Sequence, residues 1–317
     1  MTQPDPIPTA ATAATAAARP GVAAGPADVI HNIGYRAYDG PRLGRGYARM
    51  SLYSQSLRGA YGLGRSAKSK VLPMILLAAM CVPALIIVAV TIFTDRTSLP
   101  LQYTRYAVVT QAVITLFLAS QAPQSVSRDL RFKTTPLYFS RPIEVVDYVA
   151  AKFAALASAL FLLTVLPLLI LYVGALLGKL DFTDQTAGFA KALVSVILLS
   201  LLFAGIGLVI AAVTPRRGFG VAAIITLFVI TYGAVSALQG VASTQEKWDV
   251  IGWVGLFSPI TLIDGLQTWF LGATSAFPHA AGPPDVAAGC AYLLVVAGII
   301  AGSFSLLVRR YRKAGLS

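Results

Sequence analysis

The chain has few residues that could build a catalytic, metal-binding or disulfide site. Its 317 residues include only two cysteines, Cys81 and Cys290, and two histidines, His31 and His279. Both cysteines lie in long apolar runs, where a thiol behaves as a small hydrophobic group, so there is no disulfide framework and no zinc-ligand spacing. The histidines are expected on opposite sides of a membrane, which leaves no serine or cysteine paired with a histidine.

Charged side chains are also scarce. They make up 12% of the chain against 56% hydrophobic residues, a composition that predicts an integral membrane protein. The formal net charge of +12 is compatible with nucleic-acid binding, but that requires basic residues gathered on one solvated face. Here they lie between apolar runs, so we expect them to orient the protein in the membrane and expect no nucleic acid among its partners.

The apolar runs contain essentially no ionisable side chain in their interiors. Arg105, Lys152 and Lys191 all fall near the ends of runs, where a long cation can reach water. Proton- or ion-coupled transporters keep such groups at mid-depth, so any transport must draw its energy elsewhere. The GxxxxGK[ST] phosphate loop is missing too, since the nearest string, around Lys179, has the wrong spacing. We therefore expect a non-catalytic chain that binds no cofactor or metal.

Six apolar segments are each long enough to cross a bilayer as a helix, which takes about 20 residues. The predicted fold is all-α and polytopic, with a transmembrane domain over residues 71–308. The expected spans are 71–94, 103–122, 148–177, 187–213, 219–238 and 287–308.

The distribution of basic residues predicts the orientation. Most of the 25 Lys and Arg residues precede the first span, follow the last, or lie in the connections after the second and fourth spans. The positive-inside rule therefore predicts that both termini are cytoplasmic. The opposite side is expected to hold only Arg96, Arg105, Lys179, Lys191 and Lys247.

The two ends of the chain are expected to lie outside the membrane. Residues 1–44 form a tail and turn region, and up to Asp28 this tail has almost no large apolar side chain, so it is expected to be disordered. No signal peptide is recognisable there. Residues 309–317 form a basic tail.

Residues 45–70 predict an amphipathic helix lying in the membrane interface, with aromatic residues toward lipid and arginines toward headgroups. An amphipathic helix packed on a partner protein is the alternative. Gly59, Gly62 and Gly64 indicate a helix break rather than a phosphate loop. The residues assigned to the interfacial helix are Arg49, Tyr53, Leu57, Arg58 and Tyr61.

The interval 239–286 is the longest exoplasmic connection. Its short apolar runs, rich in Trp and Phe, predict two short helices that enter the outer leaflet and return; a cap packed on itself is the alternative. The carboxylates expected on this side, Asp181, Asp184, Asp249 and Asp264, are interpreted as solvated loop residues. The residues assigned to the re-entrant hairpin are Trp253, Phe257, Pro259 and Trp269.

The connection 123–147 is a polar, positively charged hairpin between the second and third spans. Because it must leave the bilayer and re-enter, it presents a docking surface on the cytoplasmic side. The residues assigned to docking are Arg128, Asp129, Arg131, Lys133, Arg141 and Pro142.

This order of elements resembles the ABC-2 type transporter permeases, the membrane subunits of ABC exporters. The most specific match is residues 137–152, LYFSRPIEVVDYVAAK, and the LFSP string at 256–259 resembles the family's exoplasmic hairpin. Arg141, Pro142, Tyr148 and Lys152 occupy matching positions. The chain departs from the family ahead of this match, where Asp129 stands in place of the usual Glu and no Gly follows.

The resemblance implies that the 123–147 hairpin is a coupling helix seated in a groove of an ATPase subunit. It implies two ATPase copies that hold ATP and Mg, and a second permease chain in a homo- or heterodimer among membrane lipids. The expected function is export of an amphipathic, lipid-like or drug-like substrate across a bacterial cytoplasmic membrane. Two alternatives stay open: a non-transporting anchor or assembly subunit of an envelope complex, and an intramembrane lipid-modifying enzyme.

Overall fold

The computed structural model describes residues 40, 43–64, 66–131, 143–214, 216–277 and 282–315, and within these ranges the chain is helical, with no strand. Residues 1–42 form a unit separate from Leu43–Ser317, so the description below concerns the second unit. The predicted tail therefore lies almost wholly outside the described residues. The elements are α1 Arg45–Ala60, α2 Ala67–Phe93, α3 Tyr103–Val109, α4 Gln111–Arg131, α6 Val145–Leu177, α7 Phe182–Val213, α8 Arg217–Thr244, α9 Trp248–Val254, the 3₁₀ turn η1 Gly255–Phe257, α10 Pro259–Leu271 and α11 Val286–Gly315.

Five of these helices, namely α2, α6, α7, α8 and α11, are long and apolar enough to cross a membrane. The pair α3 and α4 makes a sixth apolar segment, but its two helices meet at an angle of 58°. The described part of the chain therefore has five such helices, or six if the bent pair is counted as one, as expected for a polytopic membrane protein.

The bend falls inside the predicted span 103–122. Helix α3 ends at Thr110, whose backbone N–H and hydroxyl both donate to the carbonyl of Tyr106. At the other end of α3, Arg105 donates from Nε to the carbonyl of Ser275, at 2.9 Å. The continuous apolar run thus forms two helices, because the contact with Ser275 holds α3 at an angle to α4.

Helices α6 and α7 form the centre of the bundle. They pack against each other, and around them lie α1 and α2 on α6, and α4, α10 and α11 on α7. Helices α2 and α8 are the most exposed of the spans, and α2 presents large apolar side chains such as Ile86 and Phe93 outward. An apolar outer face of this kind suits contact with lipid.

Helix α1 ends earlier than predicted, at Ala60 rather than at residue 70. The turn that follows contains Gly62 and Gly64, both with positive φ, which glycine adopts without steric cost. At Gly62 an added Cβ would also lie 2.5 Å from the carbonyl oxygen of Ser69. The predicted glycine break is confirmed, and it separates α1 from the first span.

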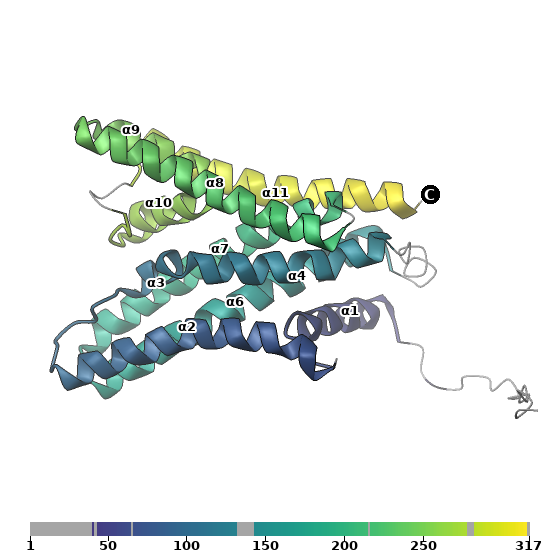
Figure 1. The fold of residues 1–317 in the computed structure, drawn as a ribbon, viewed down its shortest axis with the longest axis horizontal. Coiled ribbons are helices and arrows are strands. Elements are labelled where there is room, and N and C mark those ends of the chain that lie inside the picture. Colours follow the sequence, from purple (N-terminus) through teal and green to yellow (C-terminus); the bar gives the residue numbers. More distant parts are fainter. Residues whose placement is uncertain are drawn as a thin grey trace, which may run out of the picture. The chain divides into compact units, whose positions relative to one another are not determined.

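Cationic side chains are concentrated at one end of the bundle, where several helices begin or end. Helices α1, α2, α6 and α8 begin there, and α4, α7 and α11 end there (Figure 1). We call it the basic end, because it carries the cations at the start of α2 and α8 and those of the last turns of α11. The α2–α3 connection and α9–α10 lie at the opposite end (Figure 1).

Candidate functional site

The candidate site lies at the basic end, where α4 ends and α6 begins. The chain between them, residues 132–142, lies outside the described residues, but both anchor points are described. Polar side chains connect these two anchor points to each other and to α1.

Asp129, near the end of α4, joins α4 to α6. Its Oδ2 accepts a hydrogen bond from the hydroxyl of Tyr148 at 2.5 Å and lies 3.2 Å from Nζ of Lys152. The side chains of Lys152 and Asp129 are only 12% and 17% exposed, so little water screens the pair. The Lys152 ammonium also lies 5.6 Å from the centre of the Tyr148 ring, within the range of a cation–π contact.

Two further contacts connect this cluster to α7 and α11. The ring of Tyr148 packs on that of Tyr311 from α11, with ring centres 4.9 Å apart, and both rings are buried. Ser127 donates from Oγ to the carbonyl of Ala211 in α7, at 2.8 Å. The end of α4 is therefore fixed directly against α6 and α7, and through Tyr148 of α6 against α11.

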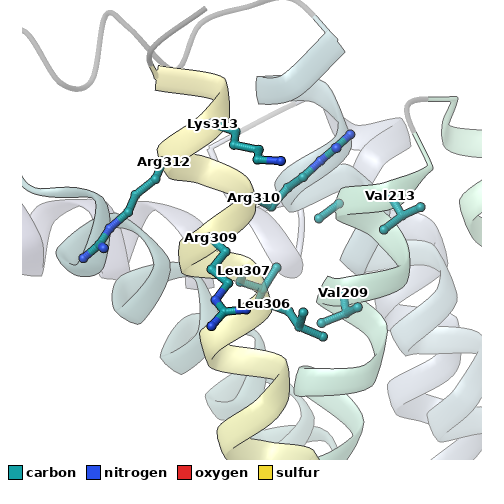
Figure 2. Close-up of a pocket in the computed structure, with 9 residues that line it drawn as sticks. Val209, Val213, Leu306, Leu307, Arg309, Arg310, Arg312 and Lys313 are labelled. Atoms are coloured by element: carbon teal, nitrogen blue, oxygen red, sulfur yellow. The ribbon is translucent and has the colours of Figure 1, made fainter.

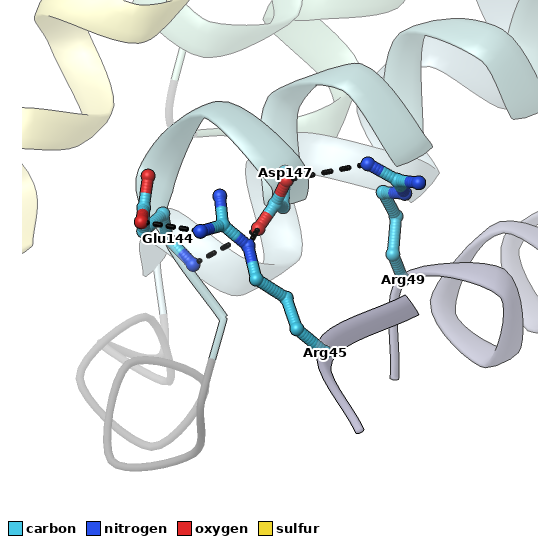
Figure 3. A network of polar contacts seen from close by, with 4 residues as sticks. All are labelled: Arg45, Arg49, Glu144 and Asp147. Carbon is cyan, nitrogen blue, oxygen red and sulfur yellow. Dashed lines mark hydrogen bonds and ion pairs between the residues drawn. The ribbon is translucent and has the colours of Figure 1, made fainter. Parts of the chain in front are cut away.

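A second cluster joins α1 to the start of α6 (Figure 3). Arg45 donates from Nε to Oδ2 of Asp147 and from Nη1 to Oε1 of Glu144, both at 2.5 Å, and Arg49 lies 3.8 Å from Oδ1 of Asp147. The pKa of the Arg45 guanidinium is raised above its ordinary value, first by its hydrogen bond to Asp147 and then by that to Glu144. Asp147 also accepts from the backbone N–H of Glu144, which caps the first turn of α6.

The two clusters lie on either side of the undescribed connection. A displacement of that connection would therefore act on α4 and α6 together, and on α1 through Arg45. Polar contacts of the two clusters thus join α1, α4 and α6 at the basic end. Among the described residues, no group of three or more His, Cys, Asp or Glu side chains could hold a metal ion.

The residues assigned to docking are only partly covered by the structure. Asp129 is described, and it bonds to α6 instead of projecting freely from the bundle. Arg128 and Arg131 lie in the last two turns of α4, with only their backbone described, and Lys133, Arg141 and Pro142 lie outside the described residues. The docking role remains a prediction.

The residues assigned to the interfacial helix divide between two faces of α1. Tyr53 donates to Oγ of Ser158 at 2.9 Å, and Tyr61, in the turn after α1, donates to the carbonyl of Ala159 at 2.7 Å. Together with Leu57, which packs against the core, they face α6. Arg49, one turn before Tyr53, also turns toward α6, where it pairs with Asp147, whereas Arg58 lies on another face and is exposed.

The predicted exoplasmic hairpin forms α9, η1 and α10. Trp253 and Phe257 are exposed, at 41% and 75%, while Pro259 is buried at the start of α10. Trp269 is 37% exposed, and its indole ring lies against Gly289 of α11. The segment therefore presents aromatic side chains outward and packs its other face on the bundle.

The prediction that Asp264 is solvated is wrong. This residue of α10 has 0% exposure, and its carboxylate accepts from Oγ of Ser275 at 2.6 Å, from Nε2 of Gln267 at 2.7 Å and from the backbone of Ala276 at 3.0 Å. Gln267 in turn accepts from Ser195 of α7. Burial raises the pKa of the Asp264 carboxyl, against the lowering effect of these hydrogen bonds. Hydropathy alone could not show that α10 turns this face to α7.

The other carboxylates of that side behave as expected. Asp181 and Asp184 are exposed, and Asp181 caps α7 by accepting from the backbone of Asp184 at 2.9 Å. Asp249 is exposed as well.

The sequence interpretation missed the α1–α6 cluster, although a signal was present. Glu144 and Asp147 have the three-residue spacing of a capping box, and Arg45 and Arg49 are four apart, on one helix face. The pairing of these two sets needs a contact between segments about a hundred residues apart in sequence, as the separation of 102 between Arg45 and Asp147 shows. Tyr311, by contrast, gave no sequence signal.

Comparison with known proteins does not add a family. No protein-family model matches the chain, and no curated protein matches it either.

Proposed function

We propose that the chain is the permease subunit of an ATP-driven exporter of the ABC-2 type. It moves an amphipathic, lipid-like or drug-like substrate across the bacterial cytoplasmic membrane, with both termini in the cytoplasm. ATP and Mg are bound by a separate ATPase subunit, present in two copies, and two permease chains form the pathway.

The observation that carries this proposal is the anchoring of the polar connection between α4 and α6. On one side Asp129 is bonded to Tyr148 and Lys152, and on the other Asp147 is bonded to Arg45. Polar contacts join α4 to α6 just before the connection, and they join α1 to α6 just after it. A connection that only linked two spans would not need both sets of contacts. Such contacts suit a connection that receives force from a partner.

The order of elements supports the same assignment. A short helix precedes the first long apolar helix, a polar connection follows α4, and the aromatic pair α9 and α10 precedes the last long helix. In the proposal, α3 and α4 together form the second of six spans, α9 and α10 are the re-entrant hairpin, and α1 lies at the membrane interface.

The proposed mechanism follows from the contacts. When ATP closes the two ATPase subunits, they displace the connection 132–142. Because Asp129 joins α4 to α6, both helices tilt together, and α1 follows through Arg45. The tilt changes access at the seam between two permease chains. The uncharged spans suit a substrate that needs no buried counter-charge.

Co-purification from mild detergent tests the proposal. We expect the tagged full-length chain to retain a nucleotide-hydrolysing subunit, and the charge reversal R131E/R141E to lower its yield. The matched control is R216E/R217E, which reverses two exposed cations at the same end, where α8 begins. Equal yields from both variants would contradict docking at the α4–α6 connection.

The same preparation separates the alternatives. If the wild-type chain co-purifies with other envelope proteins in a stable complex but not with an ATPase subunit, it is an anchor or assembly subunit. Turnover of a lipid by the purified chain without nucleotide would indicate an enzyme. Either result would replace the exporter assignment.

A further inference from the structure

The last turns of α11 and the end of α7 border an open cavity that the α4–α6 clusters do not use. Its volume is about 530 Å³. None of the nine lining residues is aromatic or acidic. They are Val209, Ala212 and Val213 of α7 and Leu306, Leu307, Arg309, Arg310, Arg312 and Lys313 of α11.

The cavity combines apolar and cationic side chains. On α11, Leu306 and Leu307 precede the four cations, and in Figure 2 the side chain of Arg309 turns back toward Leu306 while Val213 of α7 lies level with Arg310. Arg310 and Lys313 leave α11 on the side of α7, whereas Arg312 leaves on the other side (Figure 2). The apolar lining residues, which we call the floor, include Val213 and Leu306, which are 64% and 55% exposed, so apolar surface lies open beside the cations.

The position of the cations is fixed by packing. Tyr311 stands between Arg310 and Arg312 in the sequence, and its ring is buried against Tyr148. Arg310 and Arg312, the residues before and after Tyr311, are therefore both exposed at the surface of the bundle.

Among the residues that the structure describes, no carboxylate pairs with these cations. The acidic residues described at the basic end are Asp129, Glu144 and Asp147, and each is already bonded to a cation of α1 or α6. Within the described ranges, no ion pair involves Arg309, Arg310, Arg312 or Lys313, and the undescribed connection 132–142 contains no Asp or Glu. Four cations beside an open apolar floor need an anion that brings its own apolar part.

We propose that this cavity binds an anionic phospholipid of the leaflet at the basic end. The phosphate lies against Arg310 and Lys313 on the side of α7, with Arg309 and Arg312 adding positive charge nearby, and the acyl chains lie against Val209, Val213 and Leu306. Both α7 and α11 are helices of membrane-spanning length, so the floor continues toward the hydrocarbon region as the acyl chains require. A nucleotide fits less well, because no aromatic side chain is present to stack on a base. The site does not depend on the proposed exporter role.

Lipid titration of the delipidated full-length chain tests the site, with bound lipids counted by native mass spectrometry. The probes are phosphatidylglycerol and phosphatidylcholine. We expect phosphatidylglycerol to bind more tightly, and R309Q/R310Q/R312Q/K313Q to weaken it by at least about ten-fold, given the contribution of each basic residue to anionic lipid binding. The control K68Q/K70Q/R216Q/R217Q removes the same charge from exposed residues at the same end and should change the affinity little.

A second variant tests the cavity itself. V213F/L306F keeps every cation and fills the apolar floor, and both positions are exposed enough to accept a larger side chain. We expect it to lose the phosphatidylglycerol preference as well. It also keeps the test decisive if the fourfold variant fails to fold.

Three results would overturn the proposal. Equal weakening in the fourfold variant and its charge-matched control would show a general charge effect. Stabilisation of the chain by inorganic phosphate to the same extent as by phosphatidylglycerol would show a site for the free anion. Unchanged lipid binding, with loss of a co-purified protein from the fourfold variant, would show a protein-docking surface.

Discussion

The hydroxyl of Tyr148 donates to Oδ2 of Asp129 at 2.5 Å, across the point where the chain leaves α4 and returns in α6. Lys152 shares the same carboxylate oxygen from one turn further along α6, at 3.2 Å. The carboxylate therefore holds together the two helices that any force on the α4–α6 connection must move.

Removing this carboxylate should destabilise the chain. In D129A, the buried ammonium of Lys152 and the hydroxyl of Tyr148 both lose their acceptor, which we expect to lower the free energy of unfolding by about 1–3 kcal/mol. Thermal unfolding in detergent measures the effect. In the double variant D129A/K152M the loss should be smaller than the sum of the losses in D129A and K152M, because Lys152 is then no longer left charged without its carboxylate. Strict additivity would show that the pair contributes nothing.

The Arg45 contacts predict that α1 detaches when they are removed. R45A should expose the Tyr61–Gly64 turn to protease faster than wild type, because α1 then loses its bonds to Asp147 and Glu144. R58A is the matched control, since Arg58 is exposed on the same helix and makes no ion pair among the described residues. The difference should shrink in high salt, because Arg45 is half exposed and its interaction is screened. Equal cleavage rates for R45A and R58A would contradict the role of the pair.

The buried carboxyl of Asp264 predicts a pH dependence of stability. Its pKa is higher in the folded chain than the ordinary 3.8, so the folded state binds this proton more tightly than the unfolded state does. Stability contributed by this group is therefore greatest below pH 3.8 and is lost as the pH rises through the raised pKa. Thermal unfolding of the detergent-solubilised chain over this range measures the slope.

D264N should reduce that slope, because the amide stays neutral and can still accept from Gln267 and Ala276. D249N removes an exposed carboxylate and should leave the slope unchanged. D264A should cost about 1–3 kcal/mol, because Ser275, Gln267 and the backbone of Ala276 lose their acceptor. An unaltered slope in D264N would show that Asp264 does not carry the pH dependence.

Two glycines of the last part of the chain should respond oppositely to alanine. A Cβ at Gly265 would lie 2.2 Å from Cε1 of Tyr292, and Tyr292 is held there by its hydrogen bond to the carbonyl of Gly252. G265A should therefore destabilise the chain by about 1–3 kcal/mol through overpacking. Gly298, on α11, has nothing within 4 Å of an added Cβ, so G298A should stabilise the helix by about 0.5–1 kcal/mol. Thermal unfolding of the two variants side by side measures both, and a stable G265A would show that α10 can move away from α11.

The sequence predicted the fold correctly wherever a feature depends on the residues of a single segment. The predicted spans 148–177 and 187–213 match α6 and α7 to within a few residues, because apolar length alone decides whether a segment can form such a helix. The break at Gly62 was predicted from the conformational freedom of glycine. The basic end of the bundle was predicted from the distribution of Lys and Arg along the sequence. None of these requires knowledge of which helix lies beside which.

The rest depended on contacts between distant segments. The bend at Thr110 needs Arg105 bonded to Ser275, and the buried state of Asp264 needs α10 packed on α7. Neither contact leaves a trace in the composition of the segments that make it.

By itself, then, the sequence determined that this is a helical membrane protein with short polar connections and one strongly basic end, because burying the backbone in hydrocarbon admits little else. Only the tertiary structure decided that Asp129 faces Lys152, that Arg45 holds the start of α6, and that the cations of α11 lie beside an apolar floor with no ion pair to any described carboxylate. These are relations of register between helices, and register is set by packing of whole faces rather than by any one segment.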